Sequence, residues 1–126
     1  MRMRVDFPRG ALGGHGSGVI ERFAEEAVAV LLETRPGQGE KCLLGAARAI
    51  LPQWRAELTD EERGVLGMKP GDACEAYCRV RIPQDDPGAA GFDFSRLIVV
   101  CPRTGLALEK EGEGQPLVPF RSAAGR

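Results

Sequence analysis

The stretch CEAYCRVRI, residues 74–82, decides the fold class because apolar and polar side chains alternate along it. The positions on its apolar side are Cys74, Ala76, Cys78, Val80 and Ile82. A period of two residues is typical of a β-strand that buries one face. The sequence therefore predicts a half-buried strand here, with both cysteines on the buried face.

A second β-rich run, FDFSRLIVVC at residues 92–101, follows after a loop. Two shorter apolar runs come later, at residues 106–108 and 117–120. Pro119 cannot donate a hydrogen bond to a ladder, so the last run is predicted to be an edge strand. Residues 121–126 are expected to form a frayed tail. Because the chain also holds 17 glycines and 9 prolines, we expect short elements joined by turns.

The clearest local signature is TDEE at residues 59–62. The hydroxyl of Thr59 can accept a hydrogen bond from the backbone of Glu62, while the Glu62 carboxylate accepts one from the backbone of Thr59, which makes a capping box. Acidic side chains in the first turn also favour a helix through its dipole. We therefore predict a short helix that begins here and ends near Gly67.

The first half of the chain leaves more alternatives open. Between residues 17 and 34 apolar side chains recur every three or four positions, which favours a helix, although residues 28–32 are equally compatible with a buried strand. Alanines favour a helix over residues 42–51 as well. The glycine-rich run at residues 13–18 lacks the spacing of a phosphate loop, so we expect a flexible turn in which His15 is solvated.

Length and charge limit the classes of protein to which the chain can belong. With 126 residues, one domain spanning residues 1–126 is expected. Lys and Arg number 17 against 18 Asp and Glu, for a net charge of −1. This balance lacks the strong basic field of proteins that grip nucleic acid through many phosphates, so no direct nucleic-acid contact is expected.

The sequence also argues against a membrane protein and against an enzyme. No window approaches the roughly 20 apolar residues of a membrane span. The start at residues 1–4 is basic but runs into polar residues with no apolar region, so it is not a signal peptide and a cytoplasmic location is expected. A single histidine excludes any mechanism that needs two imidazoles within one subunit. The composition therefore favours a small binding domain.

The four cysteines are Cys42, Cys74, Cys78 and Cys101, and three interpretations of them are possible. A free cysteine behaves as a small apolar residue, and the strand pattern favours packing in the core. A metal site or a reactive thiol is the alternative, although zinc sites usually show closer pairs such as C-x2-C. Such a site would require Cys42 and Cys101 to converge with the other two. We expect no bound metal.

The order of several short motifs resembles the FliW family of flagellar assembly factors. The matching segments are FPRGALG (7–13), LET (32–34), LPQW (51–54), ELTDEE (57–62) with LGM (66–68), and DFSRLIVVCP (93–102). The resemblance covers about residues 5–120. The ordered set carries it, rather than any single motif.

The resemblance implies a mainly β protein: a small antiparallel β-barrel-like single domain with one or two short helices. It implies strands at about residues 27–33 and 42–50, against the local preference for helix, because tertiary context often overrides propensity. It also implies that the family's first strand is nearly absent, since only six residues precede Phe7.

The function that the resemblance implies is regulatory, without catalysis or a cofactor. Proteins of the FliW family bind the mRNA-binding regulator CsrA and stop it repressing flagellin translation, and flagellin competes by binding FliW. The partners expected are therefore CsrA and flagellin. Two rival hypotheses are a cysteine-based metal-binding or thiol protein, and a structural remnant whose recognition surface has degraded.

Aromatic and arginine side chains dominate binding hot spots, so exposed residues of these types are the candidates for partner binding. The candidate set is Trp54, Tyr77, Arg79, Asp93, Phe94 and Arg96. Asp93 and Arg96 belong to it because they place charge within residues 93–97, where the family has an apolar motif. The alternative for Trp54 is a core anchor, and Phe94 can equally point inward from its strand.

Overall fold

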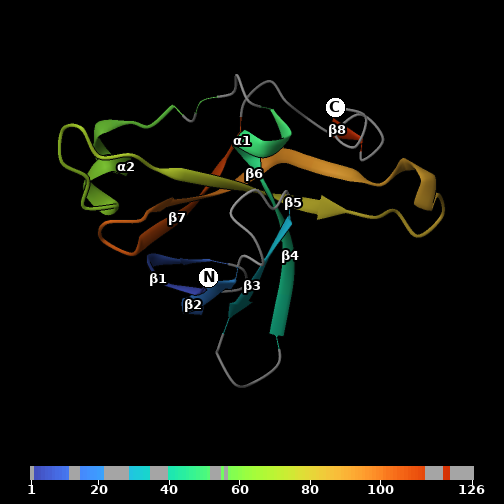
Figure 1. Ribbon diagram of the computed structural model, residues 1–126, viewed down its shortest axis with the longest axis horizontal. Helices are drawn as coiled ribbons and strands as arrows, with labels where there is room; N and C mark the ends of the chain where they lie inside the picture. The colour runs from blue at the N-terminus through green and yellow to red at the C-terminus, as the bar shows by residue number, and fades with distance from the viewer. Residues whose placement is uncertain are drawn as a thin grey trace.

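A computed structural model describes residues 2–11, 15–21, 29–34, 40–51, 55, 57–112 and 118–119, and this part of the chain is mainly β (Figure 1). The strands are β1 (Arg2–Ala11), β2 (His15–Glu21), β3 (Ala29–Thr34), β4 (Glu40–Ala46), β5 (Glu75–Arg81), β6 (Gly91–Cys101), β7 (Leu106–Glu111) and β8 (Val118–Pro119). The helical elements are α1 (Ala47–Ile50), α2 (Asp60–Val65) and the single 3-10 turn η1 (Pro87–Ala89). The predicted fold class is confirmed.

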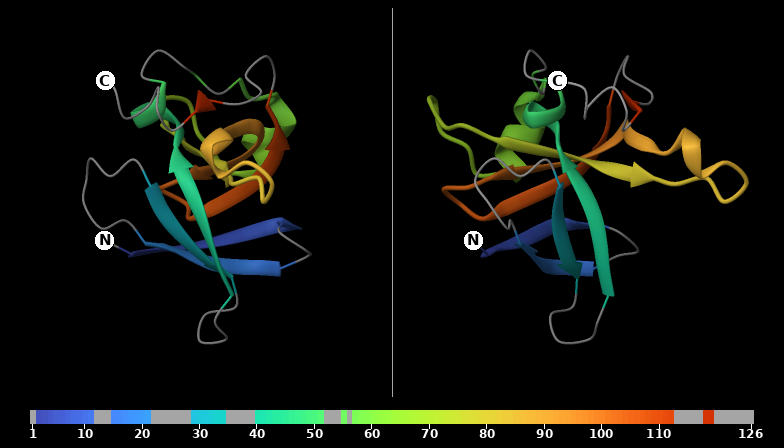
Figure 2. Two further views of the ribbon diagram at one scale, coloured as in Figure 1. Left: turned by 90° about the vertical axis from the view of Figure 1, so that its right-hand side faces the viewer. Right: turned by 45° about the vertical axis from the view of Figure 1, so that its right-hand side comes forward.

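The strands form a closed barrel of seven, in the order β5-β4-β3-β2-β1-β7-β6, which closes because β6 also pairs with β5 (Figures 1 and 2). β8 is added beside the start of β6. Among the described residues every ladder is antiparallel except that of β1 with β7, where Asp6 is paired with Leu106 in parallel. The Asp6 N–H donates to the carbonyl of Gly105 over 2.8 Å. Two strands that are far apart in the sequence, β1 and β7, are therefore neighbours in the barrel.

The interior of the barrel is filled by one cluster of apolar side chains, which we call the inner core. Its buried members are Val5, Phe7, Ile20, Val30, Leu32, Leu44, Tyr77, Ile98, Val100 and Ala107. These residues come from seven strands and alternate with outward-facing neighbours, as side chains on a pleated strand must.

A second cluster, the outer core, covers the opposite face of β5, β6 and β7. Its buried members are Ala47, Ile50, Leu66, Ala76, Cys78, Phe92, Phe94, Leu97, Val99, Cys101, Leu108 and Val118. Helix α1 and the segment that carries α2 supply the cover (Figure 1). The three strands are therefore buried on both faces, like the central strands of a layered sheet.

This second layer corrects the prediction of a half-buried strand at residues 74–82. Ala76 and Cys78 face the outer core as expected. Tyr77, placed on the polar side by the alternation, is only 1% exposed because it fills the inner core. Ile82, placed on the buried side, is 60% exposed because it follows the end of β5.

The helix that periodicity favours between residues 17 and 34 is not found in the described residues there, which form β2 and β3, and the strand that the resemblance implies at about residues 27–33 corresponds to β3. Ile20 is paired with Leu32 across these strands, and both side chains enter the inner core. The strand implied at residues 42–50 is correct up to Ala46, after which the chain turns into α1. Burial against partner strands has overridden local propensity at these positions.

Two expectations about the amino terminus are also corrected. The first strand is present, because β1 begins at Arg2, which is paired with Glu21 of β2. The turn expected at residues 13–18 is wrong from His15 onward, where β2 has begun. Gly18 lies so close to β3 that an added Cβ would be 2.9 Å from the carbonyl oxygen of Glu33. A glycine at this position therefore allows β2 and β3 to approach each other closely.

The capping box is confirmed. Thr59 Oγ1 accepts from the Glu62 N–H over 3.1 Å, and Glu62 Oε1 accepts from the Thr59 N–H over 2.9 Å. Gly67 follows the helix with a φ of 65°, a left-handed conformation that ends a helix readily. The strands predicted at residues 92–101, 106–108 and 117–120 correspond to β6, β7 and β8.

Two further expectations, Trp54 and the tail at residues 121–126, lie outside the described residues. Within the described ranges, no helix is long and apolar enough to cross a membrane.

Candidate partner-binding surface

Three of the six residues predicted to bind a partner meet at one end of the β5-β6-β7 sheet. Arg79 Nη2 on β5 lies 2.6 Å from Glu109 Oε2 on β7, and Arg96 Nη2 on β6 lies 2.9 Å from Glu109 Oε1. Arg96 Nη1 is also 3.8 Å from Glu111 Oε1. Arg79, Arg96, Glu109 and Glu111 are called the arginine–glutamate cluster below. Asp93 is paired with Arg79 across the β5–β6 ladder and adjoins the cluster.

The cluster lies on the same face of the sheet as the inner core, at the end where that face reaches solvent. Glu109 is paired with Ile98, which is itself paired with Tyr77, and both of these side chains belong to the inner core. The Glu109 side chain is 14% exposed, whereas those of Arg79 and Arg96 are 39% and 47% exposed. The carboxylate is thus held below two guanidinium groups that reach the surface. Fixed guanidinium and carboxylate groups suit charge-assisted hydrogen bonds to another protein.

An irregular stretch of β6 positions Asp93 and Arg96. The β5–β6 register shifts between Cys78 and Arg79, so that β6 contributes extra residues there. Asp93 Oδ1 accepts from the Ser95 N–H over 2.9 Å and from Ser95 Oγ over 2.6 Å. A β-bulge of this kind re-aims side chains next to functional sites. The bulge occupies the segment in which the sequence departs from the FliW motif.

A glycine after β7 makes room for this bulge. The Gly112 N–H donates to the carbonyl of Ser95 over 2.9 Å. A Cβ at position 112 would lie 1.9 Å from the Phe94 carbonyl oxygen. No side chain fits at that distance, so only glycine lets the chain pass beside the bulge.

The bulge keeps Asp93 ionised. Partial burial favours the neutral form, but the hydrogen bonds from Ser95 and the charges of Arg81 and Arg79 outweigh it. The pKa of Asp93 is therefore below its ordinary value. Asp93 therefore presents a negative charge beside Arg79 and Arg81 throughout the physiological pH range.

Tyr77 is not exposed as expected, and Phe94 takes the inward alternative, since each side chain is 1% exposed. Tyr77 lies in the inner core, and its hydroxyl donates to Glu75 Oε2 over 2.5 Å. Phe94 lies in the outer core, on the face opposite to that of Tyr77. The aromatic rings of these strands are used to fill the two cores and are not presented to solvent. The third aromatic residue of the set, Trp54, lies outside the described part of the chain.

The structure does not bring the four cysteines to one site. Cys42 packs against the inner core, whereas Cys74, Cys78 and Cys101 belong to or pack against the outer core. Over the described ranges, no group of three or more His, Cys, Asp or Glu side chains could hold a metal ion. Burial raises the pKa of the Cys42 and Cys74 thiols, and raises that of Cys78 to about 12. The four side chains thus contribute to the packing of the two cores.

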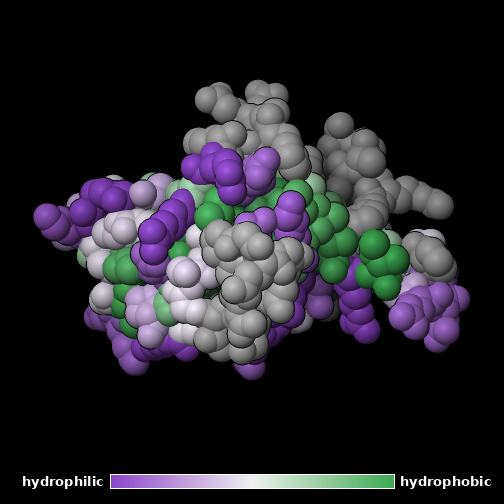
Figure 3. Space-filling model, turned by 90° about the horizontal axis from the view of Figure 1, so that it is seen from below, coloured by the Kyte–Doolittle hydropathy of each residue, from purple (hydrophilic) through white to green (hydrophobic). Residues whose placement is uncertain are grey.

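Near the cluster, strands β4 and β5 separate. Their ladder joins Leu44–Ala46 to Tyr77–Arg79, and among the described residues no strand pairs with this edge of β5 after Arg79 (Figure 1). Leu43 and Ile82, which lie just outside the ladder, are 42% and 60% exposed. Seen from below, hydrophobic residues extend across the surface toward the projecting β5–β6 hairpin (Figure 3). Apolar side chains are therefore exposed where these two strands separate.

Sequence reasoning missed Glu109 and Gly112. Glu109 lies in a run of charged residues that a sequence alone cannot distinguish from a solvated strand end. Gly112 carried a usable signal, because a glycine at a strand end often marks a bulge or a close backbone approach. Arg79 and Arg96 are among the residues predicted from the sequence to bind a partner, but nothing in the sequence shows that they share one carboxylate.

No family model matches this sequence, and no curated protein matches it either. A search of solved structures does find a similar one, described as the crystal structure of the flagellar assembly factor FliW. The TM-score is 0.72 at 14% sequence identity, and the match covers 92% of this chain and 82% of that one. The chain thus has the fold of that protein over nearly its whole length.

Proposed function

We propose that this chain is a FliW-like flagellar assembly factor that acts in the cytoplasm by binding proteins, with no catalytic step. It binds the mRNA-binding regulator CsrA, which relieves the repression of flagellin translation, and it also binds flagellin. The observation that carries the proposal is the fold match to FliW over 92% of the chain. The order of motifs along residues 5–120, which resembles that of the FliW family, is a separate observation that supports the proposal.

The arginine–glutamate cluster, together with Asp93, is the surface that we assign to the partners. Arginine is enriched at hot spots because its planar group forms several directed hydrogen bonds and also packs on apolar atoms. Arg79 and Arg96 are each held at one end by Glu109, so little side-chain freedom is lost when a partner docks.

CsrA and flagellin exclude each other in this proposal. A standard interface takes about 800 Å² from each partner, roughly a tenth of a small protein's surface. Two partners of this size fit on one domain, so exclusion requires overlapping or coupled sites. If the sites are coupled, each partner weakens the other by the same factor.

Isothermal titration calorimetry with CsrA and flagellin from the same cell tests the proposal. Each partner is titrated into the chain alone and again in the presence of the other. We expect binding of both, with a lower apparent affinity for each when its competitor is present. Equal affinities with and without the competitor would show that the chain binds both partners independently, and would contradict mutual exclusion. Binding of neither would identify the structural remnant.

A further inference from the structure

Two cysteines face each other across the end of the β5–β6 ladder. The ladder is antiparallel, and its last pair joins Glu75 to Val100. Continuing this register by one residue places Cys74 opposite Cys101. Neither cysteine takes part in a disulfide in this structure.

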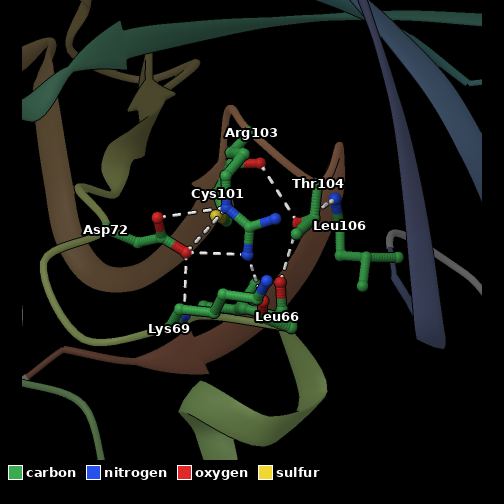
Figure 4. Close-up of polar contacts among 8 residues, drawn as sticks. Leu66, Lys69, Asp72, Cys101, Arg103, Thr104 and Leu106 are labelled. Carbon is green, nitrogen blue, oxygen red and sulfur yellow. Dashed lines mark hydrogen bonds and ion pairs between the residues drawn. The ribbon is translucent and has the colours of Figure 1, made fainter.

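A clamp beyond the cysteines shows that the register continues. Arg103 Nε donates to both carboxylate oxygens of Asp72, over 3.1 and 2.9 Å, and Arg103 Nη2 lies 2.8 Å from Asp72 Oδ2 (Figure 4). Asp72 and Arg103 are two residues further along the same antiparallel register. Arg103 Nη2 also donates to the carbonyl of Gly67, and Thr104 Oγ1 donates to that of Leu66 over 2.7 Å. The clamp and the ladder hold both sides of the cysteine pair.

Both thiols lie on one face of the sheet. Cys101 is a buried member of the outer core, and Cys74 packs against that core. Figure 4 shows Cys101 beside the Asp72–Arg103 pair. Directly opposite residues in antiparallel strands have Cα atoms about 4.5–5.5 Å apart, which falls within the range of about 4.4–6.8 Å that a disulfide requires. The backbone is therefore placed for a cross-strand disulfide.

We propose that Cys74 and Cys101 are a redox modification site, which a small-molecule disulfide such as oxidised glutathione converts to an intrachain disulfide. Cys74 is partly exposed and reacts first, whereas Cys101 is fully buried. The Cys74 thiolate attacks one sulfur of the reagent, forms a mixed disulfide and releases one reduced thiol. The Cys101 thiolate then attacks the Cys74 sulfur and displaces the second. Two cysteine thiols are oxidised, and one reagent disulfide is reduced to two thiols.

The new bond would join the segment between α2 and β5 to the last residue of β6. The Arg103–Asp72 clamp already holds this contact without a covalent link. A cross-link between residues 74 and 101 restricts the unfolded chain and so stabilises the fold. Burial, followed by the nearby Cys101, raises the pKa of the Cys74 thiol, so the first step accelerates with rising pH.

The test is incubation of the purified full chain with oxidised glutathione at alkaline pH, followed by peptide mapping without reduction. We expect one linked pair of peptides that contains residues 74 and 101, a loss of two hydrogens in mass, and two free thiols in place of four. The oxidised protein should also have a higher thermal midpoint than the reduced protein.

Two variants complete the experiment. Cys74→Ser changes a partly exposed residue and should abolish both the link and the rise in thermal midpoint. Cys42→Ser alters a thiol that packs against the other core, and it should leave both unchanged. Four free thiols after prolonged incubation, a mixed disulfide on Cys74 that never resolves, or a link through Cys42 or Cys78 would overturn the proposal.

Discussion

A Cβ atom added to Gly112 would lie 1.9 Å from the carbonyl oxygen of Phe94, closer than any side chain can approach a backbone oxygen. The Gly112 N–H meanwhile donates to the neighbouring carbonyl of Ser95. The end of β7 thus runs directly against the bulge that positions Asp93 and Arg96. The shape of the candidate surface depends on the absence of one side chain.

Gly112→Ala should therefore destabilise the protein, by about 2 kcal/mol on the scale of overpacked sites. The matched control is Gly64→Ala, because Gly64 is in α2 and has nothing within 4 Å of an added Cβ. There the alanine should stabilise the helix by roughly 0.5–1 kcal/mol. Chemical denaturation of both variants gives the two free energies. Equal stabilities would show that the bulge has room to move.

Arg96→Ala should weaken binding of CsrA or flagellin by about tenfold or more, the effect of a hot-spot side chain. Arg9→Ala is the control, since Arg9 is a similarly exposed arginine whose ion-pair partner, 2.6 Å away, is Glu61 and not a residue of the cluster. The side chain of Arg9 is 50% exposed and that of Arg96 is 47% exposed. Calorimetric titration of the variants measures both effects. If Arg79→Ala, Asp93→Ala and Arg96→Ala all bind like the parent, the assigned surface is rejected.

Glu109→Gln should destabilise the chain by about 1 kcal/mol, because two guanidinium groups then face each other without their shared carboxylate. Both arginines are well exposed, so solvent screens most of the repulsion. The loss should shrink in high salt. Glu111→Gln is the comparison, since the Glu111 side chain is 84% exposed and 3.8 Å from Arg96. Thermal denaturation should show almost no effect for that variant.

The helix cap contributes a pH-dependent part of the stability. Burial opposes ionisation of Glu62, but hydrogen bonds from Thr59 and Lys110 outweigh it and lower the pKa of the carboxyl. A lowered pKa in the folded state adds stability that is fully present above the unfolded value of about 4.3. That stability is lost as the pH falls through the folded pKa. Glu62→Gln should remove this acid-dependent part, and denaturation curves between neutral and acidic pH measure it.

Cys78 should remain unlabelled by a thiol reagent in the native state. It is 0% exposed, and burial raises its pKa to about 12, so almost no thiolate is present. Cys74 is partly exposed and should react slowly, because burial raises its pKa as well. Mass spectrometry after timed labelling distinguishes the sites. Rapid modification of both residues would contradict the packing described above.

The capping box and the strand at residues 92–101 could be predicted because each is encoded locally. Thr59 and Glu62 need only one another, and the β-branched run around Val99 is unfavourable as a helix. The region of β2 and β3 could not be assigned from periodicity, because its strands become strands only by pairing Ile20 with Leu32. The resemblance to a known family supplied that tertiary information.

The sequence could single out the arginines of the candidate surface, but it could not predict how they are arranged. Arg79 and Arg96 stand out as charges within β-rich runs, but their meeting at Glu109 depends on a register shift in β6. The burial of Tyr77 followed from a second layer that the alternation of one strand cannot reveal. Where a strand is covered by a layer on each face, the alternation of apolar and polar residues along it does not predict which side chains are buried.

The parallel contact between Asp6 and Leu106 has a consequence for how the chain folds. Hairpins such as β3–β4 join neighbours in sequence and can form early, whereas this contact must bring together distant parts of the chain. The loop entropy of that closure is lost before its contacts are gained, which slows barrel folds relative to helical ones. During synthesis, β1 cannot find its final partner until β7 has left the ribosome. β1 therefore keeps one edge unpaired until the residues of β7 have been synthesised.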